Sequence, residues 1–294
     1  MSTGAAQRTA GTTARRAAPP ARPGRSRPGW GRAALLAVVA LFLLFPLYWL
    51  VATALAPRGD LQGSELRLWP STIDLSNFSR PLTALPFGSW YVNSAAIAVV
   101  AVLITVVVNL LAGFVLAKME FRGRNVVFLV LLATLMIPVQ VVMIPQFRIV
   151  AELGWLNTYW AVIIPRAAEA FGVFLARQFM LSIPDDLLDA ARLDGASAFR
   201  IFRSVVLPLS KPLIAVLVIF TFMYRWNELG WPLIVLRDPA LYTVPVGLAF
   251  LQGQYTTDYS ALMSMALLST LPMVLVFAVF QRYLVEGIAT TGLK

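Results

Sequence analysis

The stretch SIPDDLLDAARLDGASAFRIFRSVVLPLSKP, residues 182–212, interrupts a chain that is otherwise strongly apolar. It is too polar to cross a membrane and too regular for a loose connection, and it predicts two short helices. Ser182 followed by Asp185 has the spacing of a capping box, with Pro184 in the first turn. Gly195 can adopt the left-handed conformation that ends a helix. The stretch therefore predicts a pair of helices inserted between two apolar regions.

The first predicted helix has one narrow face of small and apolar side chains that ends in an acid: Leu187, Ala190, Ala191 and Asp194. The second has an apolar stripe and is expected to end at Pro208; the stripe consists of Phe199, Phe202 and Val206. An amphipathic helix lying on the membrane surface is one interpretation. Because two successive alanines and a glycine anchor poorly in lipid, close docking against a protein surface is the favoured one.

On both sides of this insert the chain is apolar enough to cross a membrane repeatedly. Hydrophobic residues make up 59% of the 294 residues and charged residues 13%, against about 45–50% and about 25% in soluble domains. A spanning helix needs about 20 apolar residues. Six segments are long enough: 33–56, 91–117, 126–147, 157–180, 212–236 and 259–281. The sequence thus predicts an all-α integral membrane protein with six transmembrane helices and the insert between helices four and five.

The positions of the positive charges predict the orientation, because Lys and Arg resist translocation. These residues are concentrated in the N-terminal tail, in 118–124 and in 177–211. Both termini and the insert are therefore expected in the cytoplasm, with the chain in the cell membrane. The predicted organisation begins with a disordered basic cytoplasmic tail (1–32) and a first transmembrane helix (33–56). An external loop (57–90), a transmembrane core domain (91–282) and a cytoplasmic C-terminal tail (283–294) follow.

The N-terminal tail holds seven arginines and no acid in its 32 residues, among Ala, Pro, Gly and Thr. Such a stretch cannot bury enough apolar surface to fold. Although the chain has a net charge of +10, these charges are expected to lie against anionic membrane lipid, and no nucleic-acid partner is expected.

Cysteine and histidine are both absent from the sequence. Their absence excludes thiolate and imidazole metal sites, Ser-His and Cys-His nucleophiles, and disulfides. The chain also has no G-x-x-x-x-G-K-[ST] phosphate-binding loop. We therefore expect no catalytic residues, no metal and no cofactor in this chain.

The insert carries a recognisable motif, in which Asp189-Ala190-Ala191 is followed by Asp194-Gly195-Ala196 and then by Phe202 and Val205-Val206-Leu207-Pro208. This pattern resembles the E-A-A-x-x-x-G motif, with its downstream I-x-L-P, of permease subunits of binding-protein-dependent ABC importers. Asp189 and Val205 are conservative departures from the usual Glu and Ile. Further matches resemble the smaller permease of the sugar-type branch, at residues 157–160, 174–179, 226–227, 231–233 and 287–294. The resemblance covers roughly residues 86–294.

The resemblance implies a type I ABC importer transmembrane fold, in which the first helix of the insert is a coupling helix that sits in a groove of a cytoplasmic ATPase. It implies a transporter of two homologous permeases, an ATPase dimer that binds ATP and Mg, and an external sugar-binding protein. Closure of the ATPases would move the helix as a lever and drive alternating access. The coupling residues that it implies are Asp189, Ala190, Ala191, Asp194, Gly195, Ala196, Leu207 and Pro208.

Two charged pairs at i, i+3 interrupt the fourth and fifth apolar segments: Arg166 with Glu169, and Arg225 with Glu228. An unpaired charge at membrane depth costs at least about 2.5–3.5 kcal/mol, so these groups must pair or meet water. One interpretation is a structural layer of salt bridges between the two helices. The other is a polar route for a hydroxyl-rich sugar. That route would be lined by Arg166, Glu169, Tyr224, Trp226 and Asn227.

Two other classes of function are compatible with parts of the sequence. A secondary transporter would use the buried charges to couple transport to an ion gradient, and it would need no docking helix. A membrane-bound enzyme without His or Cys would need a pair of carboxylates at one depth, and only the acids matched with Arg166 and Arg225 are evident. The motif at Asp189–Gly195 favours the ATP-driven permease over both.

Overall fold

The structure is a computed structural model that describes residues 30–62, 68–251 and 258–291. Every regular element in these ranges is a helix. The chain divides into two units, Met1–Pro46 and Leu47–Lys294. Most of the predicted basic tail and residues 292–294 lie outside the described residues. The first unit contributes the apolar start of helix α1, Trp30–Leu55, which corresponds to the predicted first span.

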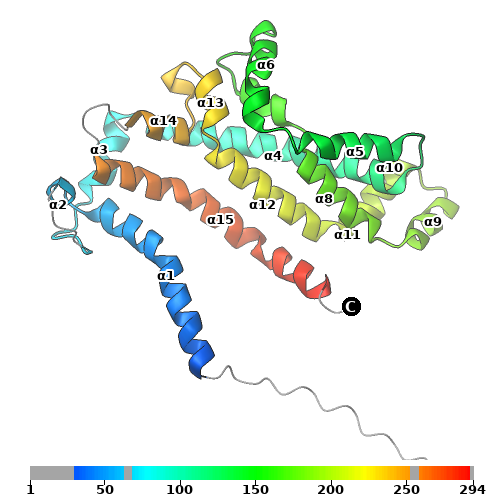
Figure 1. Ribbon diagram of the computed structural model, residues 1–294, viewed down its shortest axis with the longest axis horizontal. Coiled ribbons are helices and arrows are strands. Elements are labelled where there is room, and N and C mark those ends of the chain that lie inside the picture. The colour runs from blue at the N-terminus through cyan, green and yellow to red at the C-terminus, as the bar shows by residue number, and fades with distance from the viewer. Residues whose placement is uncertain (1–29, 63–67, 252–257, 292–294) are drawn as a thin grey trace, which may run out of the picture. The chain divides into compact units, whose positions relative to one another are not determined.

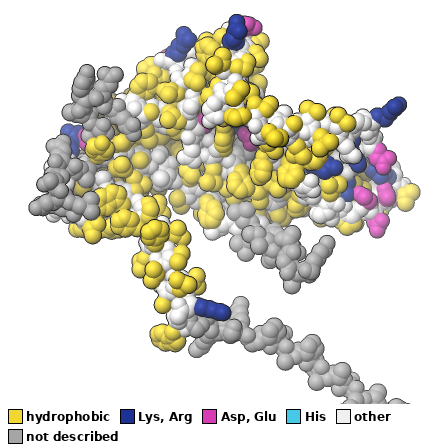
Figure 2. Space-filling view, viewed as in Figure 1, with side chains coloured by type: hydrophobic (Ala, Val, Ile, Leu, Met, Phe, Trp, Pro, Cys, Tyr) yellow, Lys and Arg dark blue, Asp and Glu magenta, His cyan; other side chains and the backbone are white. Residues whose placement is uncertain are grey.

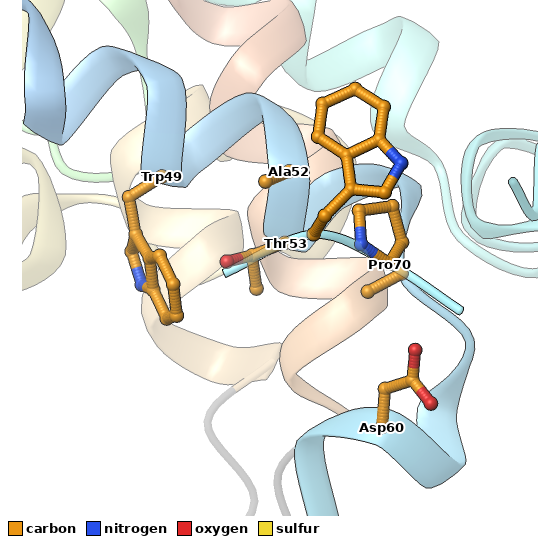
Figure 3. A pocket seen from close by; sticks show the side chains of 7 residues that line it. Trp49, Ala52, Thr53, Asp60 and Pro70 are labelled. Carbon is orange, nitrogen blue, oxygen red and sulfur yellow. The ribbon is translucent and has the colours of Figure 1, made fainter. Parts of the chain in front are cut away.

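The segment predicted to be an external loop contains two short helices, α2 (Arg58–Gln62) and α3 (Ser76–Ala84). In α3, the buried Asn77 closes the end of α1 by donating to the carbonyl oxygens of Ala54 (3.1 Å) and Ala56 (2.9 Å). Ser264 of α15 donates in turn to the Asn77 carbonyl at 2.6 Å. A cavity of about 10 Å³ beside Thr53 has room for about one water molecule (Figure 3).

Helix α4, Phe87–Lys118, is the centre of the second unit and packs against α8 (Ala170–Leu181) and α12 (Lys211–Asn227). Small residues bring α4 and α8 close together. A Cβ placed on Gly113 would lie 2.5 Å from the Cβ of Ala176, and Gly172 meets the side chain of Asn109 in the same way. Close backbone approach through small residues is how membrane helices associate. Helix α12 packs in turn against α15, Tyr259–Thr291 (Figure 1).

The third predicted span, 126–147, is wrong as a single helix. The chain forms α5 (Arg124–Thr134) and α6 (Val139–Glu152), which meet at an angle of 101°. Pro138 stands directly before α6 with an extended backbone (φ −58°, ψ 133°). Proline disfavours the helical conformation of the residue before it and cannot donate to a helix. The break therefore falls at this proline.

The fourth and fifth predicted spans are also divided. The fourth consists of α7 (Tyr159–Ile163), η1 (Ile164–Arg166) and α8, with a bend of 44° between Arg166 and Ala170. The fifth is interrupted after Asn227 and resumes as α13 (Gly230–Val235). The turn η3 (Pro239–Leu241) and helix α14 (Val244–Leu251) then precede α15. Both interruptions fall at the charged pairs.

The insert forms α9 (Asp185–Leu193), α10 (Ala198–Ile201), η2 (Phe202–Val206) and α11 (Leu207–Leu209). The predicted capping box is wrong, because Pro184 occupies the cap position and the Ser182 hydroxyl donates to the Phe179 carbonyl (2.7 Å). Pro208 does not end the second helix, since it lies in the first turn of α11. The chain turns at Ser210, and 198–209 meets α12 at 80°.

Three described helices are long and apolar enough to cross a membrane: Trp30–Leu55, Phe87–Lys118 and Tyr259–Tyr283. The total reaches six only if each of three bent helix pairs forms one span. The third of these pairs joins 198–209 to α12, whereas the sequence predicted a fifth span over 212–236. The all-helical membrane fold is therefore as predicted, but half of its spans are not straight helices.

Candidate functional site

The break between η1 and α8 leaves backbone groups without helical partners at the level of the buried charges. The Arg166 carbonyl accepts from Arg225 Nη2 and from the Thr105 hydroxyl at 3.4 Å. The Glu169 amide donates to Asn109 Oδ1 at 3.3 Å. An interrupted helix is tolerated inside a membrane protein only where neighbouring groups satisfy the freed backbone. Side chains of α4 and α12 therefore satisfy the backbone groups at this break.

Four charged side chains, which we term the ion quartet, surround the break: Arg166, Glu169, Arg225 and Glu228. Arg166 Nη1 lies 3.5 Å from Glu228 Oε1, and Arg225 Nη2 lies 3.5 Å from Glu169 Oε1. Arg225 Nη1 also lies 3.6 Å from Glu228 Oε2. Two of the three pairs join different helices, so the structure contains the interhelical salt-bridge layer that was one interpretation of the sequence.

The quartet has a buried half and an accessible half. The side chains of Arg225 and Glu228 are 0% and 6% exposed, whereas those of Arg166 and Glu169 are 13% and 29% exposed. Arg166 and Glu169 line an open cavity of about 880 Å³ between the α5–α6 bend, the η1–α8 break and α12. The salt-bridge layer therefore supplies the two charged residues of the cavity wall.

Helix α12 supplies one wall of this cavity through residues spaced at i, i+3, i+4 and i+7: Phe220, Met223, Tyr224 and Asn227. The expectation that Trp226 shares this wall is wrong. Trp226 is buried on another face of α12, where its Nε1 donates to the Ser269 carbonyl of α15 at 2.8 Å. The sequence did not predict this, because a helix that is apolar on all sides has no hydrophobic pattern that determines which of its faces points toward the cavity.

One side of helix α9 packs against the rest of the second unit. Leu188 is buried with Ile183 and Ile201. Lys118, at the end of α4, donates to the Ile183 carbonyl at 2.6 Å and to Asp185 Oδ1 at 2.7 Å. The hydrogen bond and charge of Lys118 hold the pKa of the Asp185 carboxyl below its ordinary value. Lys118 and Leu188 were not among the predicted site residues, although Lys118 is the first charge after the second apolar segment.

The end of α9 has the geometry that the sequence predicts for Gly195. This residue has φ +77°, and its amide donates to the Arg192 carbonyl at 3.0 Å. The Ala196 amide donates to the Ala191 carbonyl at 3.0 Å. These two bonds form a Schellman motif, which requires a left-handed residue that glycine adopts without strain. The chain direction after α9 is therefore fixed by Gly195.

The other side of α9 is open. Leu187, Ala190 and Asp194 are exposed, while Ala191 and Ala196 are half-buried. Asp189 pairs with Arg192 in its own helix, at 2.7 Å, with both side chains exposed. Of the remaining predicted coupling residues, Leu207 is half-buried against the core and Pro208 is exposed. Figure 2 shows acidic side chains gathered at the end of the unit that α9 occupies in Figure 1.

No group of three or more carboxylates that could hold a metal ion occurs within the described ranges. The features on which a function can be built are the cavity beside the ion quartet and the open face of α9.

Residues 109–290 match the family described as "Binding-protein-dependent transport system inner membrane component". The chain belongs to this family. It is 37% identical to the arabinooligosaccharides transport system permease protein AraQ of Halalkalibacterium halodurans, over 88% of this chain and 94% of that protein. It is 35% identical to the sn-glycerol-3-phosphate transport system permease protein UgpE of Pectobacterium atrosepticum, over 86% and 93% of the two chains.

Among solved structures, the chain is similar to a bacterial ABC transporter involved in the import of the acidic polysaccharide alginate. The TM-score is 0.79 at 26% identity, with 90% of this chain and 100% of that chain covered. As a member of the binding-protein-dependent transport family, the protein is a permease subunit of an ABC importer and a multi-pass protein of the plasma membrane.

Proposed function

We propose that this permease moves a carbohydrate into the cell by alternating access, with ATP and Mg bound by a separate ATPase dimer that docks on α9. The observation that carries the proposal is the asymmetry of α9. One side is fastened by Leu188 and Lys118, and the other side, centred on Ala190, is uncovered. A helix that is rigidly seated on one side can transmit a force applied to the other.

The proposed roles of the coupling residues follow from their positions. Ala190 and Ala191 would permit close approach of the ATPase, and the Schellman motif of Gly195 and Ala196 would set the angle at which α10 leaves. Asp189 and Asp194 are exposed acids that a basic ATPase residue can pair with. Because Asp189 already pairs with Arg192, the partner cation would compete with an exposed ion pair that contributes only about 0–1 kcal/mol.

The proposed substrate route is the cavity beside the ion quartet. Arg166, Glu169, Tyr224 and Asn227 line it, and their polar groups can exchange water for sugar hydroxyls. Its volume of about 880 Å³ falls within the range of about 300–1,000 Å³ for small-molecule sites. The transport of arabinooligosaccharides by its relative supports a carbohydrate as the cargo.

The remaining partners and the orientation are also part of the proposal. A second homologous permease, an external binding protein and membrane lipid would complete the assembly, in line with the binding-protein-dependent family description. In Figure 1, α9 lies at the opposite end of the second unit from α2 and α3. If α9 is cytoplasmic, α2 and α3 face outward, which agrees with the orientation that the positive charges predict.

The variant Ala190→Trp tests the docking face, because the Ala190 side chain is exposed and is not among the contacts of Leu188 and Lys118 that hold α9. We expect the variant to insert in the membrane but to lose the co-purifying ATPase and sugar uptake. Leu82→Trp, on the exposed surface of α3, is the control at the opposite end of the unit and should keep the co-purifying ATPase. Normal ATPase recovery and uptake with Ala190→Trp would show that the ATPase does not dock on this face and would remove α9 from the mechanism.

A further inference from the structure

The ion quartet contains two cations and two anions, and every member has a counter-charge within 3.6 Å. Among the described residues that line the cavity, only Arg166 and Glu169 are charged, and they have opposite signs. The cavity wall is therefore mainly apolar with a few polar groups, and it carries no net charge.

An anionic cargo needs an uncompensated cation at this depth. If a phosphate or a uronate took Arg166 from Glu228, three anionic groups would be left with two cations in a medium of low dielectric constant. Removing one partner from a buried ion pair is strongly unfavourable, because the other charge remains buried without compensation. A neutral ligand avoids this cost, since it can hydrogen-bond to the accessible sides of Arg166 and Glu169 without separating any pair.

The rest of the wall suits the two kinds of surface on a sugar. Thr134, Gln146 and Tyr224 offer hydroxyl and amide groups. Phe171 and Phe220 meet edge to face, with ring centroids 6.4 Å apart, and both residues are about half exposed. Aromatic faces pack against the apolar C–H faces of sugar rings, while the polar groups orient the hydroxyls.

From this charge balance we propose that the cavity selects neutral, hydroxyl-rich oligosaccharides over anionic saccharides and phosphate esters. Both neutral and anionic cargoes occur among the similar proteins, which are named for the transport of arabinooligosaccharides and sn-glycerol 3-phosphate and for the import of alginate. The inference rests on the proposed function, since it takes the cavity as the substrate route.

A first experiment measures the charge of the cavity. The chain has no cysteine, so Met223→Cys places one thiol in this chain, on the cavity wall. We expect similar labelling rates with cationic and anionic methanethiosulfonate reagents of equal size. Adding Glu169→Gln leaves the quartet with one excess positive charge, and it should shift the ratio about tenfold toward the anionic reagent. An unchanged ratio would overturn the argument from charge balance. Gln146→Cys provides a second thiol position if Met223→Cys does not assemble.

A second experiment measures which ligand occupies the cavity, in the purified complex without its binding protein, so that only the cavity selects. At about ten times its dissociation constant, arabinotriose should slow labelling of Met223→Cys about tenfold. Trigalacturonate and glycerol 3-phosphate at the same concentration should not. Protection by the anions alone would overturn the neutral selectivity but leave the route intact. Protection by none of the three would overturn the proposed route, and this inference with it.

Discussion

Lys118 and Asp185 are 67 positions apart in sequence, and Lys118 Nζ lies 2.7 Å from Asp185 Oδ1. The Lys118 side chain is 4% exposed and also donates to the Ile183 carbonyl. This pair joins the end of α4 to the start of α9. Movement of α9 therefore reaches α4 directly, and not only through the covalent connections to α8 and α10.

Lys118→Met is expected to uncouple the transporter. The methionine keeps the length and apolar contacts of the buried stem but removes both hydrogen bonds, so α9 can move without carrying α4. We expect uptake to fall about fivefold or more while ATP hydrolysis by the complex continues. Parallel uptake and ATPase assays on proteoliposomes measure the two activities. Lys118→Arg restores a donor and should recover coupling; equal loss in both variants would point to a packing role instead.

The anchoring of α9 should be insensitive to pH until the solution is strongly acidic. The Lys118 hydrogen bond lowers the pKa of Asp185 below 3.8. A carboxyl with a lowered folded-state pKa contributes stability that is complete above its unfolded pKa and is lost as the pH falls through the folded value. Hydrogen exchange of α9 amides, corrected for intrinsic rates, should therefore show constant protection from neutral pH down to about 4. Asp185→Asn should abolish the dependence below that pH, whereas a loss of protection already near neutral pH would contradict this assignment.

The contact between α4 and α8 gives a prediction about stability. In Gly113→Ala the new methyl group would lie 2.5 Å from the Ala176 Cβ and 3.0 Å from its carbonyl carbon, so the two helices must separate. Overpacking of this kind costs about 1–3 kcal/mol. Gly88→Ala is the matched control in the same helix, because nothing beyond its chain neighbours and the helix's own backbone lies within 4 Å of the position of its Cβ. Thermal unfolding in detergent should show a lower Tm for Gly113→Ala only.

Sequence reasoning succeeded where the deciding information is local. The long apolar run predicted 91–117 as a helix, and α4 covers Phe87–Lys118. The left-handed Gly195 followed from residue type and position. The cost of isolated charges at membrane depth predicted that the four charged residues must pair or meet water, and pairing was one of the two interpretations.

The sequence failed where distant neighbours decide the geometry. A membrane-helix proline is compatible with either a kink or a full break, so Pro138 alone did not predict the 101° bend. Thr105 and Asn109 gave no local sign that they satisfy the backbone at the η1–α8 break. The pair of Lys118 and Asp185 could not be predicted, because the two residues are distant in the sequence and only the folded chain brings them together.

The ion quartet gives the last prediction. Arg225→Met removes the ion-pair partner of Glu169 and leaves the two acids with Arg166 as the single remaining cation of the quartet. It also removes a donor to the Arg166 carbonyl. An uncompensated buried charge of this kind costs about 3–5 kcal/mol. Adding Glu169→Gln returns the group to neutrality, because Arg166 and Glu228, 3.5 Å apart, then remain as a balanced pair. The double variant should therefore have a higher Tm than Arg225→Met alone, although it should stay below the unmodified protein because the carbonyl has lost its donor. If the second substitution lowers the Tm further, charge balance does not govern the stability of this break, and the backbone hydrogen bond of Arg225 is its main contribution.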